Sequence, residues 1–260
     1  MKENIFDRTT AATNPIIVVT FMRSGTHLTM DLIRKQFDIG GYKYPGETLD
    51  ALYLPLDTIA MPQENHWRKV FSKINRFRRP IFKSHYLTND LSEFKVDHPA
   101  FRSWLLEKGT WIYVIRHPAK VMASLYQFNL GFKAIEDVDD WLLTQARNWV
   151  QHVEHWTSSR LGTRVLKFED IVAKPETALL QFSEILDMKC RAKLPYLPKR
   201  LNSIWKGRFL RLCALTSETT EILTETKPIN MSHLCRPDTI AAFNDTTADL
   251  RQQYSYSPLS

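Results

Sequence analysis

Cysteine is scarce in this sequence, and its scarcity bears on the compartment in which the protein works. The 260 residues contain only three cysteines, Cys190, Cys213 and Cys235, which lie far apart and form no Cys-x-x-Cys pair. An odd and widely spaced set of thiols is poor material for a disulfide framework. We therefore expect a reducing compartment and a cytoplasmic location.

Long apolar segments are missing as well. The first fourteen residues are polar and contain no apolar core of the length found in secretory signals. No uninterrupted apolar run approaches the roughly 20 residues that a helix needs to cross a bilayer. We expect no transmembrane segment, and a membrane-anchored enzyme of the secretory lumen is disfavoured.

Positive charge predominates, with 35 lysines and arginines against 28 acidic residues and a formal net charge of +7. Such a balance favours an anionic partner, which could be nucleic acid, a membrane surface or a polyphosphorylated small molecule. A surface with surplus lysine would explain the same charge without any partner. The sequence contains no recognised nucleic-acid-binding motif or aromatic–basic stacking pattern. We therefore expect no specific nucleic acid partner, while peripheral contact with a membrane stays open.

Short β-rich segments alternate with longer helical patterns, and no internal repeat or low-complexity tract interrupts them. This alternation predicts an α/β fold in which helices flank a central parallel sheet. We expect a short tail at residues 1–14 and a single domain at 15–260. Strands are predicted at 15–21, 80–84, 111–115 and 163–168, and helices at 26–37, 118–129, 138–159, 175–188, 217–226 and 237–254.

The first predicted strand runs into a glycine-bearing turn, residues 20–27 (TFMRSGTH), and then into a helix. Unpaired N–H groups and the positive end of the helix dipole make such a helix start a binding site for anions. Gly25 lets the backbone come close to a ligand, Ser24 and Thr26 supply hydroxyls, and Arg23 adds a positive charge. The second glycine and the Gly-Lys-Ser/Thr ending of a Walker A loop are absent. An ordinary turn that caps a helix is the alternative.

A lysine and a histidine lie at the end of the second predicted strand. Lys83 and His85 would face the same crevice as the loop, because ligands of open parallel sheets bind beyond the carboxyl ends of the strands. A histidine can take a proton from an acceptor hydroxyl, and a lysine can stabilise charge on a leaving oxygen. A solvated strand end is the plainer interpretation of this pair.

Arg116 follows the third predicted strand, and Ser124 lies eight residues on, about two turns along the helix that Pro118 opens. A guanidinium fork and a serine hydroxyl together suit a phosphate group. The alternative is a helix-start arginine in a surface salt bridge.

In this order the segments resemble the family of sulfotransferases that use 3′-phosphoadenosine 5′-phosphosulfate (PAPS). Residues 22–27 are similar to the family's loop for the 5′-phosphosulfate, and residues 83–85 (KSH) resemble its Lys-Thr-His catalytic segment. Arg116 and Ser124 match its 3′-phosphate segment, and residues 166–170 (LKFED) resemble its aromatic-Glu-Asp segment. The resemblance covers roughly residues 15–190 and implies a fold like that of the P-loop nucleotide hydrolases.

The resemblance also implies an activity. A sulfuryl group would pass from PAPS to a hydroxyl or amine of a small-molecule, lipid or glycan acceptor, with adenosine 3′,5′-bisphosphate as the product and no metal. His85 would be the general base, with Lys83 and Arg23 stabilising charge. The implied nucleotide-binding residues are Arg23, Ser24, Gly25, Thr26 and His27 for the 5′-phosphosulfate, Arg116 and Ser124 for the 3′-phosphate, and Phe168 near the adenine.

The sequence departs from the family pattern in several places. Arg23 stands where many members have lysine, and Ser84 replaces the usual threonine. The family's late Arg-Lys-Gly and Gly-x-x-Gly-x-Trp-Lys signature is absent; its nearest counterpart is residues 205–209 (WKGRF). From that segment Lys206, Gly207 and Arg208 are expected to clamp the 3′-phosphate and adenine. A lysine-rich dimerisation motif is missing too, so the oligomeric state is not indicated.

Residues 40–79 lie between the first predicted helix and the second strand, where the family often builds its acceptor pocket. Aromatic residues expected to line it are Tyr42, Tyr44, Tyr53, Trp67 and Phe71. Within this insertion, residues 67–79 combine an apolar face with many basic residues. The segment is either a membrane-surface or anionic-acceptor element, or an amphipathic helix packed on the core with a solvated basic face.

Two other functions remain open from the sequence. An ATP-dependent P-loop kinase is disfavoured by the missing Walker A ending and the lack of an evident Walker B carboxylate. A catalytically silent protein that binds nucleotides or polyanions is the second alternative. His152 and His155 have the spacing of two metal ligands, but no cysteine or further histidine cluster completes a site, so we expect a packed or surface pair.

Overall fold

A parallel five-stranded sheet forms the centre of the computed structural model, which describes residues 13–41, 54–56, 66–86, 98–131, 134–159, 161–191 and 229–260. The strands lie in the order β2-β3-β1-β4-β5. Their bounds are β1 Ile16–Thr20, β2 Leu54–Pro55, β3 Ile81–Ser84, β4 Thr110–Ile115 and β5 Arg164–Lys167. The predicted α/β fold with a central parallel sheet is confirmed.

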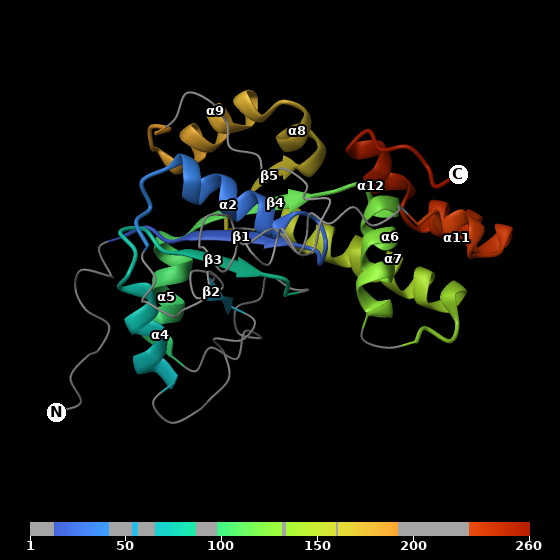
Figure 1. The fold of residues 1–260 in the computed structure, drawn as a ribbon, viewed down its shortest axis with the longest axis horizontal. Coiled ribbons are helices and arrows are strands. Elements are labelled where there is room, and N and C mark those ends of the chain that lie inside the picture. Colours follow the sequence, from blue (N-terminus) through green and yellow to red (C-terminus); the bar gives the residue numbers. More distant parts are fainter. Residues whose placement is uncertain are drawn as a thin grey trace, which may run out of the picture.

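Helices cover both faces of this sheet. They are α2 Thr26–Gln36, α4 His66–Ile74, α5 Pro99–Lys108, α6 Pro118–Leu130, α7 Val138–Thr157, α8 Phe168–Ala173, α9 Pro175–Leu186, α11 Pro237–Thr246 and α12 Ala248–Gln253, with a 3₁₀ turn at Met231–His233. Figure 1 shows α2, α8 and α9 above the sheet and α4 and α5 below it. No helix within these described segments is both long and apolar enough to cross a membrane.

The side chains of β1 explain why both faces need a cover. All five residues of β1 are buried, and successive side chains of a strand point to opposite faces. Ile16 and Val18 pack with α2, α8 and α9, whereas Ile17 and Val19 join the core built by α4, α5, α6, α7 and α11. A strand buried on both sides is typical of parallel sheets, and it accounts for the continuous apolar run in the sequence.

Several elements were not predicted from the sequence, among them β2, α5, α8 and the 3₁₀ turn at Met231–His233. Strand β2 contains two residues, too few for a periodic pattern, and it pairs with β3 at the edge of the sheet. Helix α5 begins with Pro99 behind His98, whose side chain accepts a hydrogen bond from the backbone N–H of Phe101. Proline in the first turn is a helix-start signal, so this helix could have been found.

The prediction of one continuous helix at 237–254 is wrong, because the segment consists of two helices, α11 and α12, with a break at Thr247. The hydroxyls of Thr246 and Thr247 each donate to a carbonyl four residues earlier, those of Ala242 and Phe243. Such hydroxyl bonds compete with the backbone hydrogen-bond ladder and bend helices.

Helix α4 packs on the core, as one of the two interpretations of residues 67–79 predicted. Its apolar residues Val70, Phe71 and Ile74 are buried, and Phe71 lies edge-on to the rings of His98 and Phe101. Phe71 is therefore a core residue and not one that lines an acceptor pocket. The expectation of a solvated basic face is wrong for Arg76, which is only 8% exposed.

Arg79, at the end of the same segment, joins three parts of the chain. Its guanidinium donates to the carbonyl of Asn14 at 2.7 Å, the carbonyl of Leu186 at 2.5 Å and the hydroxyl of Thr110 at 2.7 Å. These partners precede β1, end α9 and begin β4. Arg79 thereby holds the amino ends of the strands, opposite the edge where the predicted site residues lie.

We expect Arg79→Ala to lower the free energy of unfolding by about 2–4 kcal/mol, because charged hydrogen bonds to partly buried carbonyls are lost. Arg78→Ala is the matched control, since the Arg78 side chain is 75% exposed and forms a surface ion pair with Asp38. Its loss should be about 0–1 kcal/mol, as for a surface ion pair. Urea unfolding of both variants measures the difference, and equal losses would contradict the bracing role of Arg79.

Candidate active site

The predicted site residues come together at the carboxyl edge of the sheet. Parallel pairing of β1 with β3 and β4, and of β4 with β5, brings the ends of four strands side by side. The segments that follow these strands are the loop 21–25, His85, Arg116 and the first turn of α8. The edge thus collects the four motifs that the sequence places far apart.

The loop after β1 has the geometry of an anion cradle. Arg23 and Gly25 both adopt positive φ angles, of 67° and 104°, and the N–H of Ser24 donates to the carbonyl of Phe21 at 3.1 Å. Helix α2 then begins without a side-chain cap and without an acidic residue in its first turn. The hydroxyl of Ser24 is buried and has no hydrogen-bond partner among the described residues. A buried hydroxyl beside uncapped N–H groups fits an anionic ligand.

Gly25 is needed at its position for a second reason besides its φ angle. A Cβ atom there would lie 2.2 Å from Cδ2 of Phe168, so the aromatic ring rests directly on the glycine. On that ring lies the guanidinium of Arg116, 4.5 Å from its centre. The sequence placed Phe168 at the end of a strand; the structure places it at the first position of α8, where it joins the loop to Arg116.

His85 is held in one tautomer by Thr20. Its Nδ1 lies 2.9 Å from the carbonyl oxygen of Thr20, which can only accept, so the neutral ring carries its proton on Nδ1. The lone pair is then on Nε2, the arrangement a general base needs. The Thr20 hydroxyl also lies 3.2 Å from Nδ1 and 2.5 Å from the hydroxyl of Thr26, so one threonine links the base to the loop. Sequence reasoning assigned no role to Thr20.

Lys83 reaches the same place from β3. In the sheet Lys83 lies beside Val18 of β1, so the two side chains share one face of the sheet. Val18 faces α2, and Lys83 therefore points toward the first turn of that helix. Its Nζ lies 3.3 Å from Nε2 of His27. Burial, together with the charges of Lys83, His85 and Arg23, lowers the pKa of His27 to about 4. His27 is thus neutral near pH 7 and accepts a hydrogen bond from the lysine.

Arg23 turns away from His85, toward α6. Its Nε donates to the hydroxyl of Ser124 at 3.3 Å, and its guanidinium lies 4.9 Å from the centre of the Phe128 ring. Arg116 donates to the carbonyl of Arg23 at 2.8 Å. Arg23, Arg116 and Ser124 therefore form a second basic group, beside the one that contains Lys83.

A family model described as the sulfotransferase domain matches residues 13–210. The chain belongs to the sulfotransferase family. A comparison with curated proteins finds no match.

Solved structures with the same fold are sulfotransferases and related enzymes. Mouse sulfotransferase SULT7A1, complexed with PAP, has a TM-score of 0.54 at 14% identity, with 96% of this chain and 90% of that chain covered. Retinol dehydratase, in a complex with retinol and PAP, has a TM-score of 0.53 at 14% identity, with 96% and 83% covered. The sulfotransferase domain of the Synechococcus PCC 7002 olefin synthase has a TM-score of 0.50 at 14% identity, with 94% and 96% covered.

Lys206, Gly207 and Arg208 lie outside the described residues, as do the helix expected at 217–226, the pocket residues Tyr42, Tyr44 and Tyr53, and the side chain of Trp67. The part of the chain that is described contains no group of three or more His, Cys, Asp or Glu side chains arranged to hold a metal ion.

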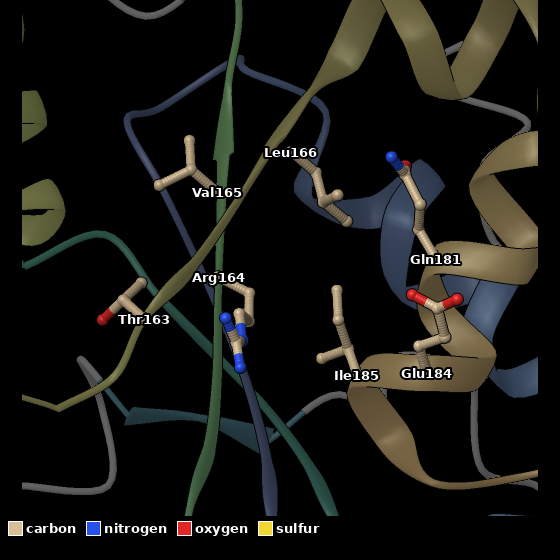
Figure 2. Close-up of a pocket in the computed structure, with 7 residues that line it drawn as sticks. All are labelled: Thr163, Arg164, Val165, Leu166, Gln181, Glu184 and Ile185. Carbon is tan, nitrogen blue, oxygen red and sulfur yellow. The ribbon is translucent and has the colours of Figure 1, made fainter.

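A hollow at the edge of the sheet is separate from the site. Figure 2 shows it between β5 and α9, lined by Thr163, Arg164, Val165, Leu166, Gln181, Glu184 and Ile185. Only Leu166 belongs to one of the four strand-end motifs, as the first residue of the segment 166–170, and none of the lining residues is an expected site residue. The hollow therefore does not extend the candidate active site.

Behind the site, His152 and His155 of α7 are a packed and a surface residue, as expected. His152 is only 1% exposed, and its Nδ1 lies 2.9 Å from the hydroxyl of Tyr113. Burial lowers the pKa of His152 to about 3, and the charges of His85 and His155 act in the same direction.

This buried histidine makes a testable contribution to pH dependence. An unfolded chain binds the histidine proton with a pKa of about 6.5, so between about pH 6.5 and 3 the unfolded state binds more protons than the folded state. Stability should therefore fall as the pH is lowered through this window. Urea unfolding between pH 7 and 4 should show a shallower loss for His152→Gln than for the wild type; the same slope in both would contradict this origin.

Proposed function

We propose that this sulfotransferase takes its sulfuryl group from PAPS and releases adenosine 3′,5′-bisphosphate. The observation that carries the proposal is the pairing of two basic groups across Phe168. One is the loop 21–25 with Lys83, and the other consists of Arg116, Arg23 and Ser124. A nucleotide phosphorylated at both its 5′ and its 3′ position presents two separate anions, one for each group. The solved structures of SULT7A1 and retinol dehydratase contain PAP, which is adenosine 3′,5′-bisphosphate, and this supports the same nucleotide as the ligand here.

The proposed reaction is direct transfer between two oxygens. Bound PAPS supplies the sulfuryl group and a phosphate as the leaving group. Nε2 of His85 takes the proton of the acceptor hydroxyl, and the oxygen of that hydroxyl forms a bond to sulfur. At the same time the bond between sulfur and the bridging phosphate oxygen breaks. Lys83 and the N–H groups at the start of α2 stabilise the charge that develops on that oxygen.

Arg23 has a divided role in this proposal. Its backbone belongs to the 5′-phosphosulfate loop, but its guanidinium lies beside Ser124, on the side assigned to the 3′-phosphate. Because the guanidinium of Arg116 donates to the carbonyl of Arg23, a hydrogen bond connects the 3′-phosphate site to the 5′-phosphosulfate loop. Stabilisation of the transferred group by Arg23 requires its side chain to leave Ser124.

We place the acceptor region at residues 40–79, and we favour a small hydroxylated molecule. Retinol dehydratase has been solved with retinol and with androsterone, both of which carry oxygen functions on an apolar skeleton. The described cysteines, Cys190 and Cys235, are free thiols, which supports a reducing compartment such as the cytoplasm. Phe243, Leu250 and Tyr256 share a core with β1, which supports a single domain at 15–260.

Incubation with PAPS and separate phenol, aliphatic alcohol, lipid and acidic glycan acceptors tests the proposal. We expect release of adenosine 3′,5′-bisphosphate that depends on one acceptor class and persists with EDTA. Release that requires magnesium and ATP would support a kinase. Tight nucleotide binding without turnover on any class would instead favour a catalytically silent homologue.

A further inference from the structure

The last residues of the chain fold back onto the turn that carries Arg116. The hydroxyl of Tyr256 donates to one carboxylate oxygen of Glu169 at 3.0 Å. The other oxygen of the same carboxylate accepts from the backbone N–H of His117, also at 3.0 Å. Glu169 thereby connects the C-terminal segment to the first residue after Arg116.

The geometry of this connection bears directly on Arg116. The N–H of His117 belongs to the peptide bond that joins Arg116 to His117. A carboxylate bound to that N–H fixes the orientation of the peptide plane, and with it the backbone from which the Arg116 side chain leaves. A hydrogen bond to an ionised carboxylate is stronger than one between neutral groups, so the orientation of this peptide is well held.

A second contact closes the connection from the other side. Nδ1 of His117 accepts from the N–H of Ala119 at 3.2 Å, so the proton of the neutral ring is on Nε2. Nε2 then donates to the hydroxyl of Ser257 at 3.1 Å. Both the backbone and the side chain of His117 are thus tied, directly or through Glu169, to residues 256–257.

The segment that makes these contacts is itself anchored. Tyr256 is only 9% exposed, and the ammonium of Lys167 lies 4.7 Å from the centre of its ring. Burial and the neighbouring Glu169 raise the pKa of Tyr256, so its hydroxyl remains a donor. One residue beyond Pro258, the backbone of Leu259 makes two hydrogen bonds with the side chain of Asn244 in α11.

We propose that Tyr256 and Ser257 are positioning residues for the 3′-phosphate site, acting through Glu169 and His117 on Arg116. The family match ends at residue 210, so these contacts come from a part of the chain outside it. The proposal rests on the proposed function, because it takes the 3′-phosphate as the ligand of Arg116. It assigns to the C-terminal segment a part in nucleotide selectivity.

Calorimetric titration of Tyr256→Phe with adenosine 3′,5′-bisphosphate and with adenosine 5′-monophosphate tests this. The variant loses only the hydroxyl that holds Glu169. We expect affinity for the bisphosphate to fall by about 5–10-fold, which corresponds to about 1–1.4 kcal/mol, with little change for the monophosphate. Tyr254→Phe is the matched control, since its hydroxyl is hydrogen-bonded to Thr157, whereas Glu169 accepts from Tyr256 and His117. It should leave both affinities unchanged.

The ratio of the two affinities separates positioning from general loosening of the fold. A purely structural role would weaken both nucleotides together, and that result, or an unchanged ratio, would overturn the proposal. Ser257→Ala removes the hydroxyl that accepts from His117 and leaves the bond between Tyr256 and Glu169 in place, and it should lower the ratio in the same direction. A wild-type protein that does not prefer the bisphosphate would overturn the proposed function as well, so the two failures are distinguishable.

Discussion

Replacing His85 with alanine should lower the rate of sulfuryl transfer by about 10²–10⁴-fold, the usual contribution of a general base. The reason lies in the hydrogen bond from Nδ1 to the carbonyl of Thr20, which leaves the lone pair on Nε2. Nucleotide affinity should change little, because His85 is assigned to the acceptor's proton. Turnover and calorimetric titration with adenosine 3′,5′-bisphosphate measure the two effects separately.

His155→Ala is the control for this change, because it removes an exposed histidine from α7 and leaves the site untouched. It should have wild-type turnover. If His85→Ala keeps most of the activity, another group must take the proton, and the proposed mechanism is wrong. If it loses nucleotide binding as well as turnover, His85 holds the donor and its role as a base is unsupported.

Gly25→Ala should weaken adenosine 3′,5′-bisphosphate binding by more than about tenfold, or about 1.4 kcal/mol. Its φ angle of 104° lies where residues with a Cβ are strained, and the new methyl group would lie 2.2 Å from Cδ2 of Phe168. The ring must move, and with it the surface on which the guanidinium of Arg116 rests. Both phosphate sites are disturbed by one methyl group. Titration of the folded variant measures the loss.

Gly162→Ala separates the effect of backbone strain from that of the contact with Phe168. Gly162 also has a positive φ, of 65°, but a Cβ there meets nothing within 4 Å. It should lower stability by about 1–2 kcal/mol through backbone strain alone and leave nucleotide affinity unchanged. Equal affinity in Gly25→Ala and the wild type would show that the contact between Gly25 and Phe168 has no part in binding.

The framework of the site was predictable because its signals are local. Each of the four predicted strands is a short β-rich run, and a candidate site residue lies at its end or within a few positions after it. The rule that parallel strands share one carboxyl edge then brings Ser24, His85, Arg116 and Phe168 together without further information. Proline at 118 and 175 marks two helix starts that the structure contains.

The contacts that connect these motifs were not predictable, because they join residues distant in the sequence. Tyr256 and Glu169 are 87 positions apart, and neither has a pattern that indicates the other. The direction of the Arg23 side chain depends on its own positive φ angle, which no propensity for arginine would suggest. At the break, the hydroxyl of Thr247 shares the carbonyl of Phe243 with the backbone N–H of the same residue, a bond that the helical pattern of the sequence does not indicate.

Thermal unfolding with adenosine 3′,5′-bisphosphate, ADP, and ATP with magnesium, side by side, tests the central claim most directly. A ligand at about 100 times its dissociation constant stabilises the fold by about 2.7 kcal/mol, a shift that is easily measured. Stabilisation by the bisphosphate well above that by ADP or ATP is the predicted result, because Arg116 and Ser124 would bind its 3′-phosphate. Stabilisation by ATP with magnesium alone would contradict the account.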